Sequence, residues 1–142
     1  MERTEPTRPS TLVDANVLLD VWTDDRVWAD WSQAALDDAA TGSRLVINPI
    51  VFAEASASFA TVEEVEALLP DPLFTREAIP WPAAFLAGKA HLAYRRRGGA
   101  RRTTLPDFFI GAHAAVAGHR LLTRDPSRFR SSFPRLEIIA PS

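Results

Sequence analysis

The chain has 142 residues, the size of one domain, and 46% of them are hydrophobic, which is enough for a buried core. Its net charge of −2 gives no global field for nucleic acid or membrane, and the absence of cysteine excludes disulfides and thiolate zinc sites. No apolar run approaches the ~20 residues of a membrane-spanning helix, and residues 1–9 lack an apolar signal core. We expect a cytoplasmic protein with a flexible leader over residues 1–9 and a single domain over residues 10–142.

The first predicted strand, within residues 10–14, ends at an acid. It is a short apolar run that contains β-branched Val13 and stops at Asp14, and a helix-like run follows almost at once. This pattern indicates a buried strand that delivers a carboxylate to its C-terminal end. In open α/β sheets, ligands bind at that end of the strands.

The middle of the chain alternates predicted helices with short strands. Asn48-Pro49 combines a favourable N-cap with a first-turn proline, and Thr61 and Glu64 fit a capping box. Glu54 interrupts an apolar stretch, and a lone buried acid is costly unless it is paired or bound to a metal. We expect a helix that Asp24 and Asp25 can cap and that runs to about residue 40. Further helices are expected from 49, over 61–69 and over 82–96, with strands over 44–47 and within 73–79.

The last third of the chain contains a helix that is apolar nearly all round. It begins at Pro106-Asp107 and ends before Gly118, so we expect it to be central and buried. A strand over 121–123 follows, and a final strand covers 136–140. Strands that alternate with helices predict an α/β fold of three layers, with a central, mainly parallel sheet of four to five strands flanked by helices.

Four carboxylates stand out by position: Asp14, Glu54, Asp107 and Asp125. Taken singly, Asp14 and Asp125 can cap helices, and Asp107 can complement a helix dipole. In a doubly wound sheet, however, strand ends and the starts of the following helices share one edge, so these three acids should converge. Carboxylates ~4 Å apart repel by about 4 kcal/mol at an effective dielectric of about 20, which favours a bound cation. Oxygen ligands favour Mg²⁺ or Mn²⁺, and such an ion predicts hydrolysis of a phosphate ester.

The segments that carry these acids resemble the PIN domain family. They read LVDAN at 12–16, FAE at 52–54, PDFFIGAHA at 106–114 and LLTRD at 121–125. The resemblance spans nearly the whole chain and is strongest to the ribonuclease toxins of bacterial VapBC-type toxin–antitoxin pairs. Ala15 departs from the family, which often carries a hydroxyl residue there, and Pro106 before the third acid is also less usual.

The resemblance implies a Mg²⁺- or Mn²⁺-dependent endoribonuclease, the toxin of a type II toxin–antitoxin pair. One acid would help to deprotonate the attacking water, and cleavage would leave a 5′-phosphate and a 3′-hydroxyl. Asn16 and Thr123 match polar positions that support the acids by hydrogen bonds, and Asp125 ranks fourth among the acids. The resemblance implies these ligands of the metal: Asp14, Glu54, Asp107 and Asp125.

The resemblance also implies two protein partners. One is a second copy of the chain, as a homodimer, and the other is a VapB-like antitoxin that wraps the toxin and blocks its site. The predicted helices over residues 27–36 and 62–69 are our candidates for the apolar surface that such partners need.

Five arginines lie within eight residues around a Gly-Gly pair. They are placed to bind RNA phosphates beside an acidic site, but they also suit a helix C-terminus and a solvated loop. The three histidines lack metal-ligand spacing, and we expect His113 to be a hydrogen-bonded core residue. The RNA-binding candidates are Arg95, Arg96, Arg97, Arg101 and Arg102.

Other functions stay open from the sequence. A catalytically silent PIN-fold module would bind RNA or protein without metal-dependent cleavage. A phosphatase that forms an aspartyl phosphate should carry a second acid two residues after the nucleophile, where this chain has Asn16, and no glycine-rich phosphate loop follows the first strand. A DNase that uses the same acids also remains open, because metal chemistry alone does not select the sugar.

Overall fold

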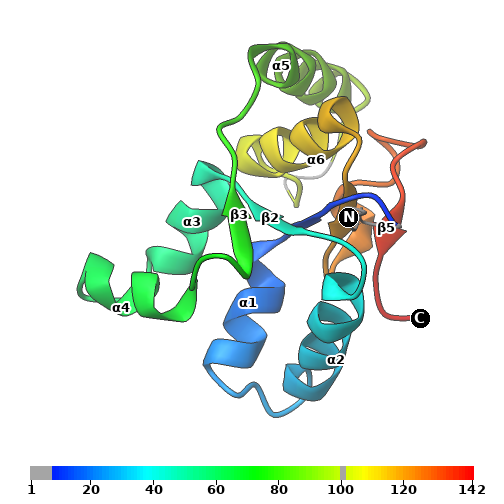
Figure 1. Ribbon diagram of the computed structural model, residues 1–142. Coiled ribbons are helices and arrows are strands. Elements are labelled where there is room, and N and C mark those ends of the chain that lie inside the picture. The colour runs from blue at the N-terminus through cyan, green and yellow to red at the C-terminus, as the bar shows by residue number, and fades with distance from the viewer. Residues whose placement is uncertain (1–7, 100–101) are drawn as a thin grey trace, which may run out of the picture.

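A five-stranded parallel sheet lies at the centre of the described residues, with α1 and α2 on one side of it and α5 and α6 on the other (Figure 1). The computed structural model describes residues 8–99 and 102–142, so residues 1–7 of the predicted leader, and Arg101, fall outside this part. The strands lie in the order β3-β2-β1-β4-β5, which confirms the predicted α/β fold. They are β1 (Thr11–Val13), β2 (Leu45–Ile47), β3 (Phe74–Arg76), β4 (Arg120–Leu122) and β5 (Ile138–Ile139).

Local capping signals set the starts of several helices. The Asn48 side chain accepts a hydrogen bond from the backbone N–H of Val51 at 2.9 Å, and Thr61 and Glu64 form the predicted capping box. The helices are α1 (Ala15–Trp22), α2 (Ala29–Ala40), α3 (Pro49–Ser56), α4 (Val62–Leu68), α5 (Trp81–Arg96), α6 (Leu105–Ala117) and the 3₁₀ turn η1 (Pro126–Arg128). None of the helices in residues 8–99 and 102–142 has the length and apolarity that crossing a membrane requires.

The second helix begins later than the sequence predicts. Asp24 takes a left-handed conformation, with φ of 51°, in the turn before it. Asp25 accepts hydrogen bonds from the backbone N–H groups of Val27 and Trp28, at 2.9 and 2.8 Å. This pair of bonds stabilises a turn, and α2 starts only at Ala29.

Helix α6 is central and buried, as its apolar surface predicts. It packs between α5 and the sheet, so apolar side chains around most of its circumference are covered. A Cβ atom on Gly111 would lie 2.4 Å from the ring of buried Phe133, so this close approach requires glycine. Gly118 ends the helix at a φ of 75°, a left-handed conformation that glycine adopts without a steric penalty.

The register of β1 and β4 defines the edge of the sheet where polar residues gather. Val13 of β1 pairs with Leu122 of β4, so the next residues, Asp14 and Thr123, follow side by side at the C-terminal ends of adjacent parallel strands. The backbone N–H of Asp14 donates to the carbonyl of Leu122 at 2.9 Å. The first acid therefore lies at the strand end that the sequence predicts.

Candidate active site

Asp14 is a buried carboxylate whose direction is set by Thr123. The Thr123 hydroxyl donates to Asp14 Oδ2 at 2.8 Å and accepts from the backbone N–H of Asp125 at 3.1 Å. Asn16 Nδ2 lies 3.5 Å from the same hydroxyl, and Asn16 Oδ1 accepts from the backbone N–H of Arg124 at 3.3 Å. Thr123 thus contacts the acid directly, whereas Asn16 reaches it through Thr123.

Asp107 lies in the first turn of α6 and is also buried. Its Oδ2 accepts hydrogen bonds from the backbone N–H and the hydroxyl of Thr104, at 2.9 and 3.2 Å. This capping box orients the carboxylate and leaves Oδ1 to face Arg128, whose Nη1 donates to it at 3.3 Å. Asp107 therefore has a structural role through one oxygen and presents the other to the site.

Asp125 shares the arginine that Asp107 contacts. It lies just before η1, which brings Arg128 back so that its Nε donates to Asp125 Oδ2 at 3.1 Å. The hydroxyl of Ser127 donates to the other oxygen, Oδ1, at 2.8 Å. Asp125 is more exposed than Asp14 and Asp107, with 32% of its side chain accessible.

Glu54 completes the group from α3. Burial, and then the charges of Asp14 and Asp107, raise the pKa of this half-buried carboxyl from 4.5 to about 7. The pKa of Asp14 is also raised, mainly by burial, although the Thr123 hydrogen bond and the charge of Arg128 oppose the change. Arg128 contacts Asp107 and Asp125, and the charges of Asp14 and Asp107 act on Glu54, so the four acids lie in one region around Arg128.

Arg128 belongs to this site, although the sequence analysis does not single it out. Its pKa is raised by the charges of Asp107, Asp14 and Asp125, against the effect of burial. Its spacing of three residues from Asp125 across a Pro126 turn is the signal that could have found it.

The donor set fits a hard divalent cation. Asp107 and Asp125 each have one oxygen that accepts from a hydroxyl and a second oxygen that faces Arg128, and Asp14 accepts from the Thr123 hydroxyl through Oδ2. Among the described side chains, the four carboxylates face one guanidinium as their charge partner, so negative charge is in excess. Carboxylate oxygens with excess negative charge suit Mg²⁺ or Mn²⁺.

The arginine cluster lies on the segment that leads into α6. Arg95 and Arg96 form the last turn of α5, and Arg97 follows them with its guanidinium 5.7 Å from the ring centre of Tyr94. Arg102 comes two residues before Thr104, the N-cap residue of α6. These four arginines are exposed, so the cluster is accessible to a polyanion on the approach to Asp107.

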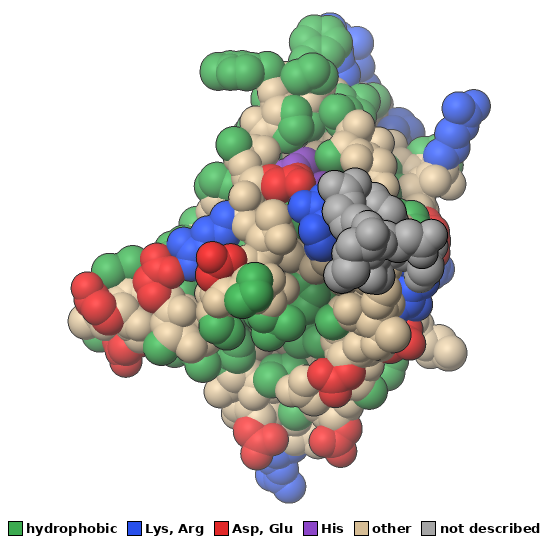
Figure 2. Space-filling model, viewed as in Figure 1, with side chains coloured by type: hydrophobic (Ala, Val, Ile, Leu, Met, Phe, Trp, Pro, Cys, Tyr) green, Lys and Arg blue, Asp and Glu red, His purple; other side chains and the backbone are tan. Residues whose placement is uncertain are grey.

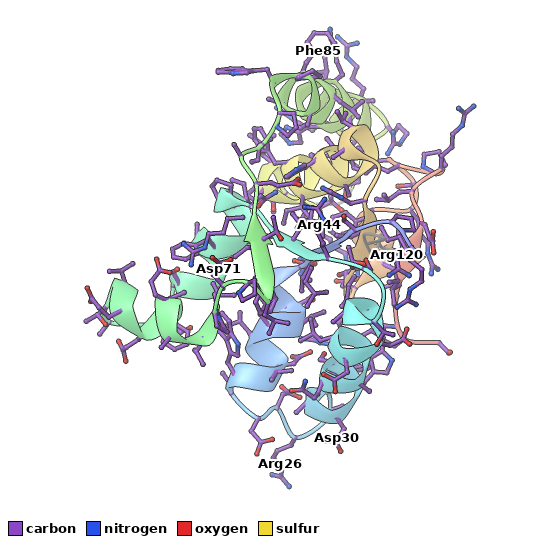
Figure 3. The ribbon with its side chains drawn as sticks, in the orientation of Figure 1. Arg26, Asp30, Arg44, Asp71, Phe85 and Arg120 are labelled. Atoms are coloured by element: carbon purple, nitrogen blue, oxygen red, sulfur yellow. The ribbon has the colours of Figure 1, made fainter. Side chains whose placement is uncertain are left out.

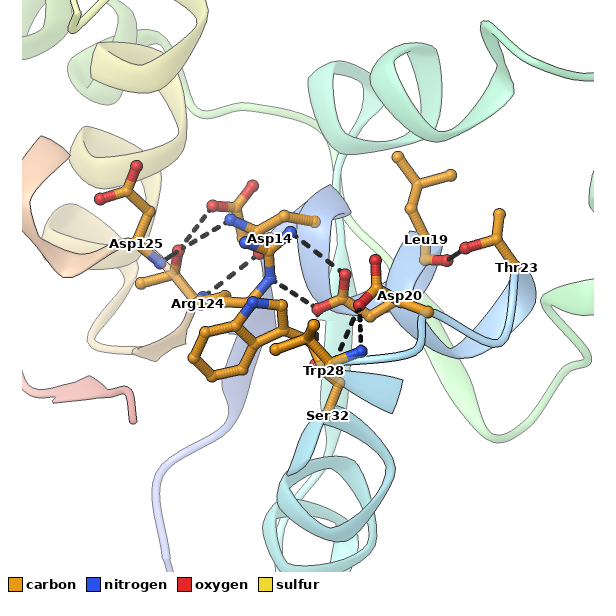
Figure 4. Close-up of polar contacts among 12 residues, drawn as sticks. Asp14, Leu19, Asp20, Thr23, Trp28, Ser32, Arg124 and Asp125 are labelled. Atoms are coloured by element: carbon orange, nitrogen blue, oxygen red, sulfur yellow. Dashed lines mark hydrogen bonds and ion pairs between the residues drawn. The ribbon is translucent and has the colours of Figure 1, made fainter. Parts of the chain in front are cut away.

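A second acid–arginine contact lies beside the site (Figure 4). Arg124 donates from Nε and Nη2 to the two carboxylate oxygens of Asp20, at 2.7 and 3.1 Å. The Ser32 hydroxyl also donates to Asp20 at 2.8 Å, and the guanidinium lies 5.4 Å from the ring centre of Trp28. This contact was not predicted from the sequence, although Asp20 is the one acid in α1, a helix that is apolar apart from Asn16 and Asp20.

Two histidines that are separate in the sequence meet at Glu77. The Nε2 atoms of His113 and His119 lie 3.1 and 2.8 Å from Glu77 Oε1, a combination that can hold metals in other proteins. Here Asn48 Nδ2 lies 3.0 Å from His113 Nδ1, and Asn48 Oδ1 is fixed as the acceptor of the α3 cap. His113 Nδ1 is therefore an acceptor, and its Nε2 proton points to Glu77.

This arrangement favours a closed hydrogen-bonded cluster over a metal site. A metal on His113 Nε2 would place the ring proton on Nδ1, against the amide N–H₂ of Asn48. Burial lowers the pKa of His113, which keeps the ring neutral. The expectation of a hydrogen-bonded core histidine is confirmed, while His119 lies closer to His113 than the sequence suggests.

Comparison with known proteins identifies the family. A family model described as the PIN domain matches residues 11–131. One similar solved structure is VapBC2 from Rickettsia felis, with a TM-score of 0.71 and 16% identity over 92% of this chain and 97% of that chain. Another is VapBC-1 from nontypeable Haemophilus influenzae, with a TM-score of 0.70 and 16% identity over 92% of this chain and 96% of that chain. A toxin–antitoxin complex from Klebsiella pneumoniae is also similar (0.68, 21%, 94% and 98%).

These identities show a common fold, and no curated protein sequence matches the chain. The resemblance noted in the motifs is confirmed, because the family model covers most of the chain and includes all four acids. The chain belongs to the PIN domain family.

Proposed function

We propose that the chain is a metal-dependent endoribonuclease, the VapC-type toxin of a toxin–antitoxin pair, acting in the cytoplasm. The observation that carries this proposal is the convergence of four carboxylates from β1, α3, α6 and the turn after β4. Membership of the PIN family and similarity to VapBC structures support a nuclease that hydrolyses phosphodiester bonds.

The four acids would hold Mg²⁺ or Mn²⁺, which, when bound, supplies positive charge that activates water and offsets charge on the phosphoryl group. Thr123 orients Asp14, and Thr104 orients Asp107, so two carboxylates are fixed before RNA arrives. One of the acids, directly or through a water, would accept the proton of the attacking water.

The exposed arginines before α6 would bind the RNA backbone. Arg95, Arg96, Arg97 and Arg102 are accessible, and the segment that contains them leads directly to the first turn of α6. An acidic centre repels a polyanion, so neighbouring cations are needed to attract it. Specificity for RNA over DNA is part of the proposal and is tested directly below.

Cleavage of total RNA with end-mapping tests the proposed function. The wild type should cleave RNA with Mg²⁺ or Mn²⁺, but not with EDTA, and leave 5′-phosphates and 3′-hydroxyls. Asp107→Asn should lose cleavage, whereas Asp30→Asn, at an exposed acid on α2, should not. Equal cleavage by all three proteins would overturn the proposal, and preferential cleavage of single-stranded DNA would replace it with a DNase.

We also propose a VapB-like antitoxin and a homodimer as partners. The candidate antitoxin surface covers α2 and α4, where Val27 before α2 and Val62 on α4 are 75% and 54% exposed. Figure 2 shows acidic side chains beside apolar ones over α4, so a partner there should offer basic groups as well as apolar contacts. If hydrogen exchange with an antitoxin bound protects neither helix, this surface is wrong.

Helix α5 presents a further apolar surface. Trp81 and Phe85 are 88% and 69% exposed, and Figure 3 shows Phe85 pointing away from the sheet. Helix α5 was not among the surfaces predicted from the sequence, which were α2 and α4. The same exchange experiment should therefore report protection on each of the three helices separately. A homodimer is checked by light scattering of the isolated chain.

A further inference from the structure

We propose that Arg128 is the resident cation of the acid centre: it partly offsets the charge of the acids in the metal-free protein and competes with the divalent ion for Asp107 Oδ1. This inference rests on the proposed function, since it requires that the acids bind a metal. It makes Arg128 a positioning residue whose guanidinium moves away from Asp107 as the metal enters.

The geometry places Arg128 between two acids from different elements. Its Nη1 lies 3.3 Å from Asp107 Oδ1 on α6, and its Nε lies 3.1 Å from Asp125 Oδ2 after β4. Its positive charge also acts on Asp14 and Glu54, so it influences all four acids. The guanidinium therefore lies where positive charge is needed.

The oxygens that Arg128 contacts are those that other protein groups leave over. Thr104 holds Oδ2 of Asp107 and leaves Oδ1, and Ser127 holds Oδ1 of Asp125 and leaves Oδ2. An entering metal would need Asp107 Oδ1 as a ligand, because Oδ2 already accepts two hydrogen bonds from Thr104. One Asp107 oxygen cannot lie against both cations at close range, so the cations compete.

The contacts of Arg128 are suited to exchange. Arg128 makes one hydrogen bond to each of two carboxylates, at 3.1 and 3.3 Å, and no bidentate contact with a single carboxylate. The side chain is 35% exposed, so Nη1 can leave Asp107 for water while Nε stays on Asp125. One guanidinium carries one positive charge among four acids, so a divalent ion compensates the acids better.

Calorimetric titration of the full chain with Mn²⁺ tests this proposal. Arg128→Met should bind Mn²⁺ at least about tenfold more tightly than the wild type. Solvent screens the partly exposed side chain, so the change is smaller than unscreened Coulomb repulsion would give. Arg128→Lys keeps the charge and should stay within about threefold of the wild type. Arg130→Met, at an exposed arginine two residues away, is the matched control and should bind as the wild type does.

Thermal melting of the same proteins gives a second readout. In EDTA, Arg128→Met should melt at a lower temperature than wild type, and saturating Mn²⁺ should raise its melting temperature by more than it raises that of wild type. Arg128→Lys provides the folded comparison if Arg128→Met does not fold without metal.

The outcomes separate the two proposals. If the wild type binds Mn²⁺ and Arg128→Met binds it equally or more weakly, Arg128 helps to build the metal site and the competition is wrong. If the wild type binds Mn²⁺ no better than Asp107→Asn does, the acids are not the metal site and the proposed function fails first.

Discussion

Two arginines four residues apart, Arg124 and Arg128, meet acids in opposite ways. Arg124 places two nitrogens on the two oxygens of Asp20, a pairing of one cation with one anion that Ser32 completes. Arg128 divides its hydrogen bonds between Asp107 and Asp125 and, among the described residues, is the guanidinium that also offsets Asp14 and Glu54.

The difference separates a contact that holds the fold from a site that needs a ligand. Asp20 is buried but balanced in charge, and its contacts join α1, α2 and the end of β4. The acid centre holds more negative charge than the guanidinium neutralises, which is unfavourable in a folded protein unless a cation binds. Burial alone is therefore a weak guide to function, whereas buried charge in excess is a strong one.

The largest expected difference between the two regions is in RNA cleavage. Asp14→Asn should lower the cleavage rate at least about 100-fold, since each factor of ten corresponds to about 1.4 kcal/mol of lost transition-state stabilisation. Asp20→Asn keeps the shape and the acceptor oxygen and should cleave within about threefold of the wild type. Single-turnover rates of the two folded variants make this comparison, and an equal loss in both would remove the distinction.

The second expected effect is on stability, where loss of the Asp20 contact should be the costly change. Asp20→Ala leaves Arg124 without its carboxylate, and we expect the free energy of unfolding to fall by about 3 kcal/mol, the lower end for a broken buried pair because Arg124 is 30% exposed. Asp30→Ala, at an exposed acid in the first turn of α2, should cost less than about 1 kcal/mol. Urea unfolding measures both, and similar losses would mean that the Asp20 contact contributes little.

The third effect is a pH dependence that belongs to the acid centre. The pKa of Glu54 lies above its unfolded value, so the folded protein binds more protons between pH 4.5 and about 7. The stability that this residue contributes is complete below that window and is lost as the pH rises through about 7. Metal-free wild type should therefore lose stability relative to Glu54→Gln over this window.

The burial of His113 acts in the other direction, because a lowered histidine pKa makes stability rise with pH. The difference between wild type and Glu54→Gln isolates the carboxylate, because both proteins contain His113. Thermal melting at pH 5, 6 and 7.5 in EDTA measures it, and a constant difference between the two proteins would contradict the raised pKa.

The smallest expected effect tests the second balanced cluster. Asn48→Ala removes the cap of α3 and the partner of His113 Nδ1, and we expect a loss of about 1–2 kcal/mol in unfolding free energy. Thr61→Ala, which removes the cap of α4 alone, should cost about 1 kcal/mol and serves as the control. If the Asn48 cluster only supports the fold, the Mn²⁺ affinity of the folded variant should remain that of the wild type.

Features with a local signal were predictable from the sequence. Asn48-Pro49 and the Thr61–Glu64 box start helices as expected, and the apolar surface of α6 predicts its central place. The convergence of three acids follows from parallel topology, which places strand ends and helix starts at one edge. Glu54 required a different argument, the cost of a lone acid in an apolar segment.

The contacts that the sequence did not predict join distant residues through long side chains. Arg124 and Asp20 are 104 positions apart, and Glu77 and His113 are 36 apart. An arginine or a glutamate has no local pattern that marks its partner, because a long side chain can turn to water or to an acid with little change in the backbone. Arg128 had a local signal in its three-residue spacing from Asp125, but its second partner, Asp107, is 21 positions away.

Thermal melting with and without Mn²⁺ tests whether the acid centre is a cation site with negative charge in excess. Asp107→Asn should melt above the wild type in EDTA, because it removes repulsion while Asn can still accept from Thr104, and it should lose most of the Mn²⁺-induced rise. Asp20→Asn should keep the full rise. Equal Mn²⁺ effects in all three proteins, or no effect in the wild type, would show that the acid centre is not a cation site.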